Sequence, residues 1–85
     1  MSTYRLARGV RLQHGPNGEG TLLVPEGIVE LNDSALATLE LVDGTRDARS
    51  IAALLSERYE SDPTEMAADV AELLTALAER GFIVA

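Results

Sequence analysis

The stretch TLLVPEGIVEL (residues 21–31) decides the fold that this sequence predicts. Residues 21–24 form a β-prone run, residues 25–27 (PEG) are typical of a tight turn, and residues 28–31 form a second short apolar run. Runs joined by so short a connection usually pair as neighbouring antiparallel strands. The stretch therefore predicts two adjacent strands, around which the rest of the chain can be placed.

A further strand is predicted before this pair. Residues 4–12 alternate roughly between apolar and charged side chains, as a partly exposed strand does. Residues 14–20 (HGPNGEG) contain three glycines and a proline, which indicates a flexible turn. Residues 4–32 therefore predict a three-stranded antiparallel meander.

Residues 33–81 predict three helices. Asn32 to Ser34 offer N-cap candidates for a first helix that runs to about Val42. Asp47 is expected to cap the second helix, and the sequence DPTE (residues 62–65) gives the third helix an acidic cap and a proline in its first turn. The expected inner face of the second helix consists of Ile51, Leu54, Leu55 and Tyr59.

The chain is expected to form one domain, residues 1–85, because it is too short for a second core. After a stop at Gly81, the apolar residues 82–84 are expected to fold back onto that core. Three strands followed by three helices predict an α+β fold of winged helix-turn-helix type.

Charge and composition limit the function classes. Fourteen acidic residues face seven arginines, for a net charge of −7, which repels phosphate backbones and argues against a nucleic-acid partner. The third helix of a winged-helix domain usually reads DNA, yet here residues 62–80 carry five acids and one arginine. No apolar run approaches the length of a membrane span or a signal peptide, so we expect a cytoplasmic protein that does not contact membranes.

The sequence offers little chemistry for an enzyme. It has no cysteine or lysine, and its single histidine, His14, falls in the glycine-rich turn. Catalysis needs a rigidly held nucleophile beside a base, and a metal site needs several convergent ligands. The glycines of residues 15–20 have neither the lysine nor the following helix of a phosphate loop. We therefore predict no catalytic residue, no metal and no cofactor.

The strand at residues 28–31 is the remaining candidate for function. It lies at the end of the predicted meander, and Glu30 is its only charge. An unpaired strand edge beside an amphipathic helix can accept an extended peptide as a further strand. On the third helix Glu65, Asp69 and Glu72 form an acidic ridge that is either an ordinary solvated face or a lip that orients a basic segment. An ordinary capped edge is the alternative for the strand.

Three motifs carry a resemblance to a known family. They are LLVPEGIVELN (residues 22–32), LVDG (residues 41–44) and DVAELLTALAERGFIV (residues 69–84), in that order and at similar spacing. The chain resembles the coenzyme PQQ (pyrroloquinoline quinone) biosynthesis protein D family over about residues 5–84. The family position after Leu22-Leu23 is often aromatic, whereas this chain has Val24.

The resemblance implies a stand-alone recognition element that binds a ribosomally made precursor peptide, chiefly its leader. It implies delivery of that peptide to a radical S-adenosylmethionine enzyme, which crosslinks a glutamate and a tyrosine of the precursor. It further implies that the leader adds to the third strand and packs against the third helix. The residues so selected are Ile28, Val29, Glu30 and Leu31 for backbone pairing and Met66, Asp69, Val70, Leu73 and Leu77 for the groove.

Other functions stay open at this point. Similar recognition domains serve other ribosomal-peptide pathways, such as lasso peptides. A winged-helix domain that regulates transcription and a structural dimerisation module are candidates from other classes. We expect a monomer at low concentration, with exchange of the N-terminal strands between two copies as the alternative, because glycine-rich hinges occur at residues 15–20 and 25–27.

Overall fold

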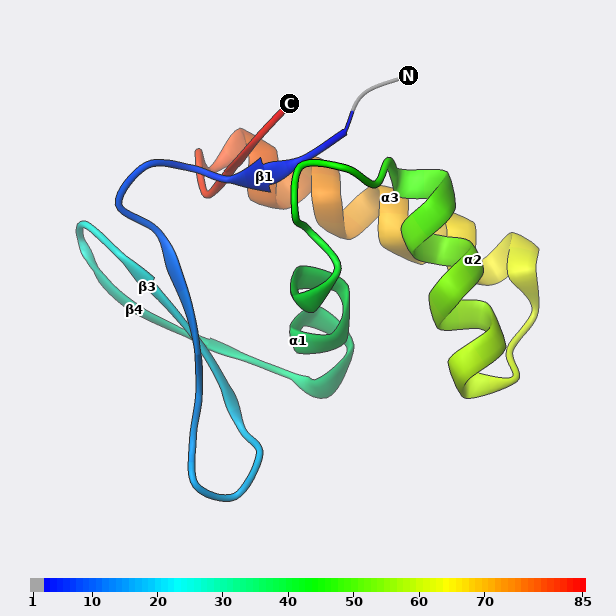
Figure 1. Ribbon diagram of the computed structural model, residues 1–85, viewed down its shortest axis with the longest axis horizontal. Helices are drawn as coiled ribbons and strands as arrows, with labels where there is room; N and C mark the ends of the chain where they lie inside the picture. The colour runs from blue at the N-terminus through cyan, green and yellow to red at the C-terminus, as the bar shows by residue number, and fades with distance from the viewer. Residues whose placement is uncertain (1–2) are drawn as a thin grey trace.

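The computed structural model describes residues 3–85 (Figure 1). The elements, in chain order, are β1 (Arg5–Leu6), β2 (Arg11–His14), β3 (Gly20–Val24), β4 (Gly27–Leu31), α1 (Asp33–Glu40), α2 (Ala48–Tyr59), α3 (Pro63–Glu79) and β5 (Ile83–Val84). The predicted α+β fold, a three-stranded antiparallel sheet followed by three helices, is confirmed. It is compatible with a winged-helix arrangement.

The main sheet has the order β2-β3-β4. Val24 pairs with Gly27 across the Pro25-Glu26 loop, so the connection between β3 and β4 is a two-residue hairpin. Leu22 of β3 is fully buried at 0% exposure and lies between Leu12 of β2 and Val29 of β4 in the register. This row of apolar side chains marks the face of the sheet that packs on the helices.

The first predicted strand is in fact two strands. Residues 5–6 form β1, which pairs with β5, and the chain then turns at Gly9 before it enters the main sheet as β2. Gly9 has a φ of 82°, in the left-handed region that glycine adopts without strain. His14, expected in a turn, is the last residue of β2. The expected return of the C-terminal residues to the core is confirmed by the β1–β5 pairing.

Side-chain caps start the helices as predicted. The Oδ1 atom of Asn32 accepts a 2.8 Å hydrogen bond from the Ala35 N–H at the start of α1, and Asp62 accepts one of the same length from the Thr64 N–H at the start of α3. Asp47 caps α2, and hydrogen bonds from the backbone and side chain of Ser50 lower the pKa of its carboxyl. Helix α1 ends at Glu40, slightly before the expected Val42.

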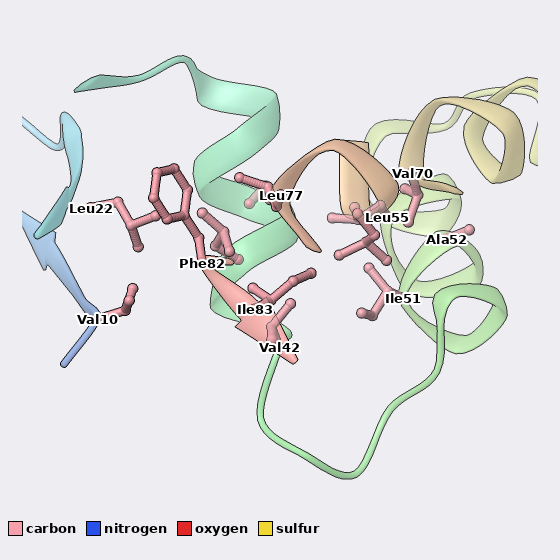
Figure 2. Close-up of a cluster of buried hydrophobic side chains, with 13 residues drawn as sticks. Val10, Leu22, Val42, Ile51, Ala52, Leu55, Val70, Leu77, Phe82 and Ile83 are labelled. Carbon is pink, nitrogen blue, oxygen red and sulfur yellow. The ribbon is translucent and has the colours of Figure 1, made fainter. Parts of the chain in front are cut away.

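One hydrophobic core joins the sheet to the helices. Figure 2 shows Val10 and Leu22 at its sheet end and Ile51 and Leu55 at its helix end, with Phe82 between them. The inner face of α2 differs from the expected one. Its buried members are Ile51, Ala52, Leu55 and Ser56, whereas Leu54 and Tyr59 are 41% and 50% exposed.

Gly20, the first residue of β3, lies in close contact with Leu36 of α1. A Cβ atom at this position would lie 2.6 Å from the Cδ1 atom and 2.9 Å from the Cγ atom of Leu36. Because both residues are buried, an added methyl group must displace packed atoms.

We therefore expect Gly20→Ala to lower the free energy of unfolding by about 1–3 kcal/mol, the usual cost of overpacking. Urea unfolding should show this loss. In a Leu36→Ala background the clashing atoms are gone, so the added cost of Gly20→Ala should become much smaller. An equal cost in both backgrounds would contradict the close contact between β3 and α1.

Candidate functional site

Strand β4 has a free edge. It pairs with β3 on one side, and no other strand within residues 3–85 pairs with its second side. Because Val24 and Gly27 flank the two-residue loop, they form a hydrogen-bonded pair, and such pairs alternate with non-hydrogen-bonded pairs along the ladder. The N–H and C=O groups of Val29 therefore face β3, and those of Ile28 and Glu30 face the free edge.

The side chains of β4 alternate between two faces. Val29 and Leu31 are half-buried and pack against the core on the helix side of the sheet. Ile28, with 69% of its surface exposed, and Glu30 point to the opposite, outer face. Of the four residues selected from the sequence, Ile28 and Glu30 therefore offer backbone groups at the free edge. Val29 and Leu31 instead pair with β3 and pack against the core.

A pocket of about 300 Å³ lies among the start of α1, the C-terminal half of α2 and the first half of α3. Its lining residues are Asp33, Ser34, Thr38, Leu55, Tyr59, Met66, Asp69, Val70 and Leu73. We call it the α1–α3 pocket. In the sequence, only Asn32 separates the end of β4 from Asp33, the first residue of α1 and a lining residue of the pocket.

The residues selected on α3 do not all reach this pocket. Met66, Asp69 and Leu73 line it with accessible or half-buried side chains. Val70 also lines it but is only 2% exposed, so it belongs to the pocket floor. Leu77 is buried in the core and does not line the pocket.

Five lining residues were not selected from the sequence: Asp33, Ser34, Thr38, Leu55 and Tyr59. The first three lie in α1, whose start directly after β4 was indicated by the Asn32 cap. Thr38 is buried and its hydroxyl donates a 2.9 Å hydrogen bond to the Ser34 carbonyl oxygen, so its polar atom is satisfied within the helix. Nothing in the sequence pattern showed that the end of α2 would complete the wall.

The pocket combines an apolar floor with an acidic rim. Asp33 and Asp69 are exposed, and no arginine or histidine is among the lining residues. The ion pair found within residues 3–85, with 2.7 Å between Arg46 Nη1 and Asp43 Oδ2, lies elsewhere, as does the 2.8 Å hydrogen bond between His14 Nε2 and Glu40 Oε2. An apolar ligand group with a neighbouring positive charge would therefore complement the pocket.

No cluster of three or more histidine or acidic side chains within residues 3–85 is arranged to hold a metal ion. None of the described helices has the length and apolarity needed to cross a membrane.

Comparison with known proteins gives consistent matches. The pattern of the family described as coenzyme PQQ synthesis protein D matches residues 19–83. A PqqA binding protein of Xanthomonas campestris is 41% identical over 76 residues, which cover 88% of this chain and 83% of that protein. A PqqA binding protein of Azotobacter vinelandii is 48% identical over 81 residues, which cover 93% of this chain and 86% of the other.

Solved structures show the same relationship. One is the NMR structure of the PqqD part of Methylobacterium extorquens PqqCD, which is described as a stand-alone recognition element for ribosomally synthesised, modified peptides. It matches this chain with a TM-score of 0.82 and 37% sequence identity, over 96% of this chain and 88% of that one. A homologous bifunctional protein C/D is much longer, and this chain covers 21% of it.

A lasso peptide synthetase B1 in complex with its leader peptide has a TM-score of 0.83 and 26% identity, over 99% of this chain and 100% of that one. The two PqqA binding proteins, however, are more similar to this chain, at 41% and 48% identity. The resemblance seen in the sequence motifs is thus confirmed, and the chain belongs to the coenzyme PQQ synthesis protein D family.

Proposed function

We propose that this protein is a non-catalytic recognition element that binds the precursor peptide of PQQ synthesis by strand addition to β4. The relatives named PqqA binding protein support the choice of peptide. The observation that carries the proposal is the free edge of β4, on which Ile28 and Glu30 present backbone groups that β3 does not pair.

Backbone pairing supplies affinity at this edge. Exposed N–H and C=O groups at a strand edge attract another extended chain, because each group gains a partner in the added ladder. Glu30 is the only charged residue in β4, so the edge has little of the charge that usually prevents such pairing. The edge alone would not distinguish one peptide from another.

The α1–α3 pocket supplies selectivity. A peptide paired with β4 that continues past Leu31 reaches the start of α1, where Asp33 forms part of the pocket rim. Burial of one large apolar side chain against Met66 and Leu73 would contribute about 1.5–3 kcal/mol. A lysine or arginine beside that apolar residue would be attracted to Asp33 and Asp69.

The partner enzyme is the one that the family resemblance implies. We propose that the loaded protein, acting as a monomer, presents the peptide to the radical S-adenosylmethionine enzyme of PQQ synthesis. The lasso leader complex supports peptide binding by this fold but not this pathway, since its identity to the chain is 26%. The PQQ precursor is therefore the first peptide to test.

An NMR titration of labelled protein with the synthetic PQQ precursor peptide tests the proposal. We expect chemical-shift changes concentrated in residues 27–34 and in the part of α3 that contains Met66, Asp69 and Leu73. Two proline variants make the test specific to strand addition. Ile28→Pro removes an N–H from the free edge, so it should weaken peptide binding while the β3–β4 ladder stays intact.

Val29→Pro is the matched comparison, because it removes an N–H that faces β3. It should lower the free energy of unfolding more than Ile28→Pro does, since a ladder carbonyl loses its donor. A folded Ile28→Pro variant with unchanged peptide affinity would contradict strand addition. Chemical-shift changes confined to residues outside β4, α1 and α3 would contradict the proposed location of the peptide-binding site.

The acidic rim gives a second prediction. Asp69→Asn should weaken binding of the precursor peptide by about two- to fivefold at low salt, the range of a single exposed ion pair. The difference from wild type should shrink as salt rises, because screening weakens the same pair. Isothermal titration calorimetry at two ionic strengths measures both effects. As a control, Glu72→Gln removes a charge from α3 outside the pocket and should change peptide affinity much less. An equal loss of peptide affinity in both variants would mean that Asp69 acts only through the net charge of the protein.

A further inference from the structure

The outer face of the main sheet carries a short row of three side chains. Arg11 of β2 pairs with Leu23 of β3, and Leu23 pairs with Ile28 of β4. Residues directly opposite each other in an antiparallel sheet point to the same face. The three side chains therefore lie side by side, from one edge of the sheet to the other.

This row is not part of the core. Its neighbours Leu12, Leu22 and Val29 face the helices, and the alternation of a strand turns Leu23 and Ile28 the other way. Neither Leu23 nor Ile28 packs against the core cluster, and Ile28 is the most exposed large apolar residue within residues 3–85, at 69%. Figure 1 shows α1, α2 and α3 on one side of the sheet, so no helix within residues 3–85 lies on the outer face.

Positive charge borders the row. Arg11 is exposed and forms no ion pair within residues 3–85. Arg8, also exposed, lies in the turn before β2, whose Gly9 approaches the ring of Pro25 in the β3–β4 loop. One arginine thus forms the β2 end of the row and a second lies three residues before it, in a protein with a net charge of −7. We call Arg11, Leu23, Ile28 and the adjacent Arg8 the outer-face patch.

We propose that the outer-face patch is the docking surface for the enzyme that modifies the bound peptide. The complementary surface of that enzyme carries an apolar side chain that covers Leu23 and Ile28, with carboxylates placed to pair with Arg11 and Arg8. This inference rests on the function proposed above, because it assumes that a peptide occupies the free edge of β4.

The position of the patch favours this partner. A peptide added to β4 extends the sheet by one strand, and its alternate side chains then continue the outer face directly beside Ile28. A protein docked on the patch would therefore touch the added strand as well as the sheet. The recognition element would in this way hold the peptide against the enzyme that receives it.

A second copy of the chain fits the patch less well. Two molecules that each carry a charge of −7 repel one another, and an enzyme surface with local carboxylates meets the arginines without that opposition. The α1–α3 pocket is on the helix side of the sheet, so the peptide's anchor there leaves the outer face free.

The test uses two variants of the patch and two matched controls. Arg11→Glu reverses a charge, and Leu23→Thr replaces an apolar contact with a polar residue that still favours a strand. Arg49→Glu and Leu54→Gln make comparable changes on exposed positions of α2. For each variant, calorimetry measures affinity for the precursor peptide, and biolayer interferometry measures affinity for the radical enzyme with and without peptide.

We expect Arg11→Glu and Leu23→Thr to lower enzyme affinity by about tenfold or more, as changes at the centre of an interface do, with unchanged peptide affinity. Arg11→Lys should retain most of the binding, and both controls should match wild type. Unchanged enzyme affinity in both patch variants, with normal peptide binding, would overturn the docking surface and leave the proposed function intact. Wild-type dimers that Leu23→Thr dissociates would assign the patch to self-association and also overturn it.

A wild-type protein that binds neither peptide nor enzyme would overturn both proposals. Enzyme binding that depends on Arg11 and Leu23 without any peptide binding would reject the proposed function and the role of the patch in delivering a bound peptide, while retaining the patch as the contact surface for the enzyme. The two proposals can therefore fail separately.

Discussion

The register between β3 and β4 is the constraint on which the rest of the structure depends. The two-residue Pro25-Glu26 loop sets Leu22 opposite Val29. A shift by one residue would turn Leu22, which is fully buried, to the outer face and bring Leu23 inward. The same shift would exchange the backbone groups that face β3 with those that face the free edge. One register therefore sets both the side chains that enter the core and the backbone groups at the free edge.

This register divides the strand pair into three separate surfaces. The inward side chains hold the sheet on the helices, the edge of β4 offers the backbone of Ile28 and Glu30, and the outward side chains of Leu23 and Ile28 form the apolar part of the outer-face patch. A small domain cannot bury a deep cleft, and a strand edge needs none. In the function proposed above, peptide selectivity comes from the α1–α3 pocket, whose wall the helices supply.

Much of this arrangement could be predicted from the sequence, because it depends on local signals. The PEG turn placed β3 and β4, and the caps at Asn32, Asp47 and Asp62 placed the helices. The break between β1 and β2 was missed because the alternation of residues 4–12 continues through a turn at Gly9. The pairing of β1 with β5 depends on a contact across the whole chain, which no local pattern encodes.

The site was harder to predict than the fold. On α3, apolar spacing could not separate Leu77, which is buried in the core, from Leu73, which lines the pocket, because both lie on the same side of the helix. Tyr59 was expected inside and is half exposed at the pocket wall, because the end of α2 extends past the core. Which β4 amides face the edge depends on the hairpin register and cannot be obtained from the apolar pattern alone.

The measurement that tests strand addition most directly is amide hydrogen exchange of β4 with and without the precursor peptide. In the free protein, the Val29 amide should exchange slowly because it faces β3, and the Ile28 and Glu30 amides should exchange fast. Saturation with peptide should slow exchange at Ile28 and Glu30 and leave Val29 nearly unchanged. Tight peptide binding with fast exchange retained at both Ile28 and Glu30 would contradict the account.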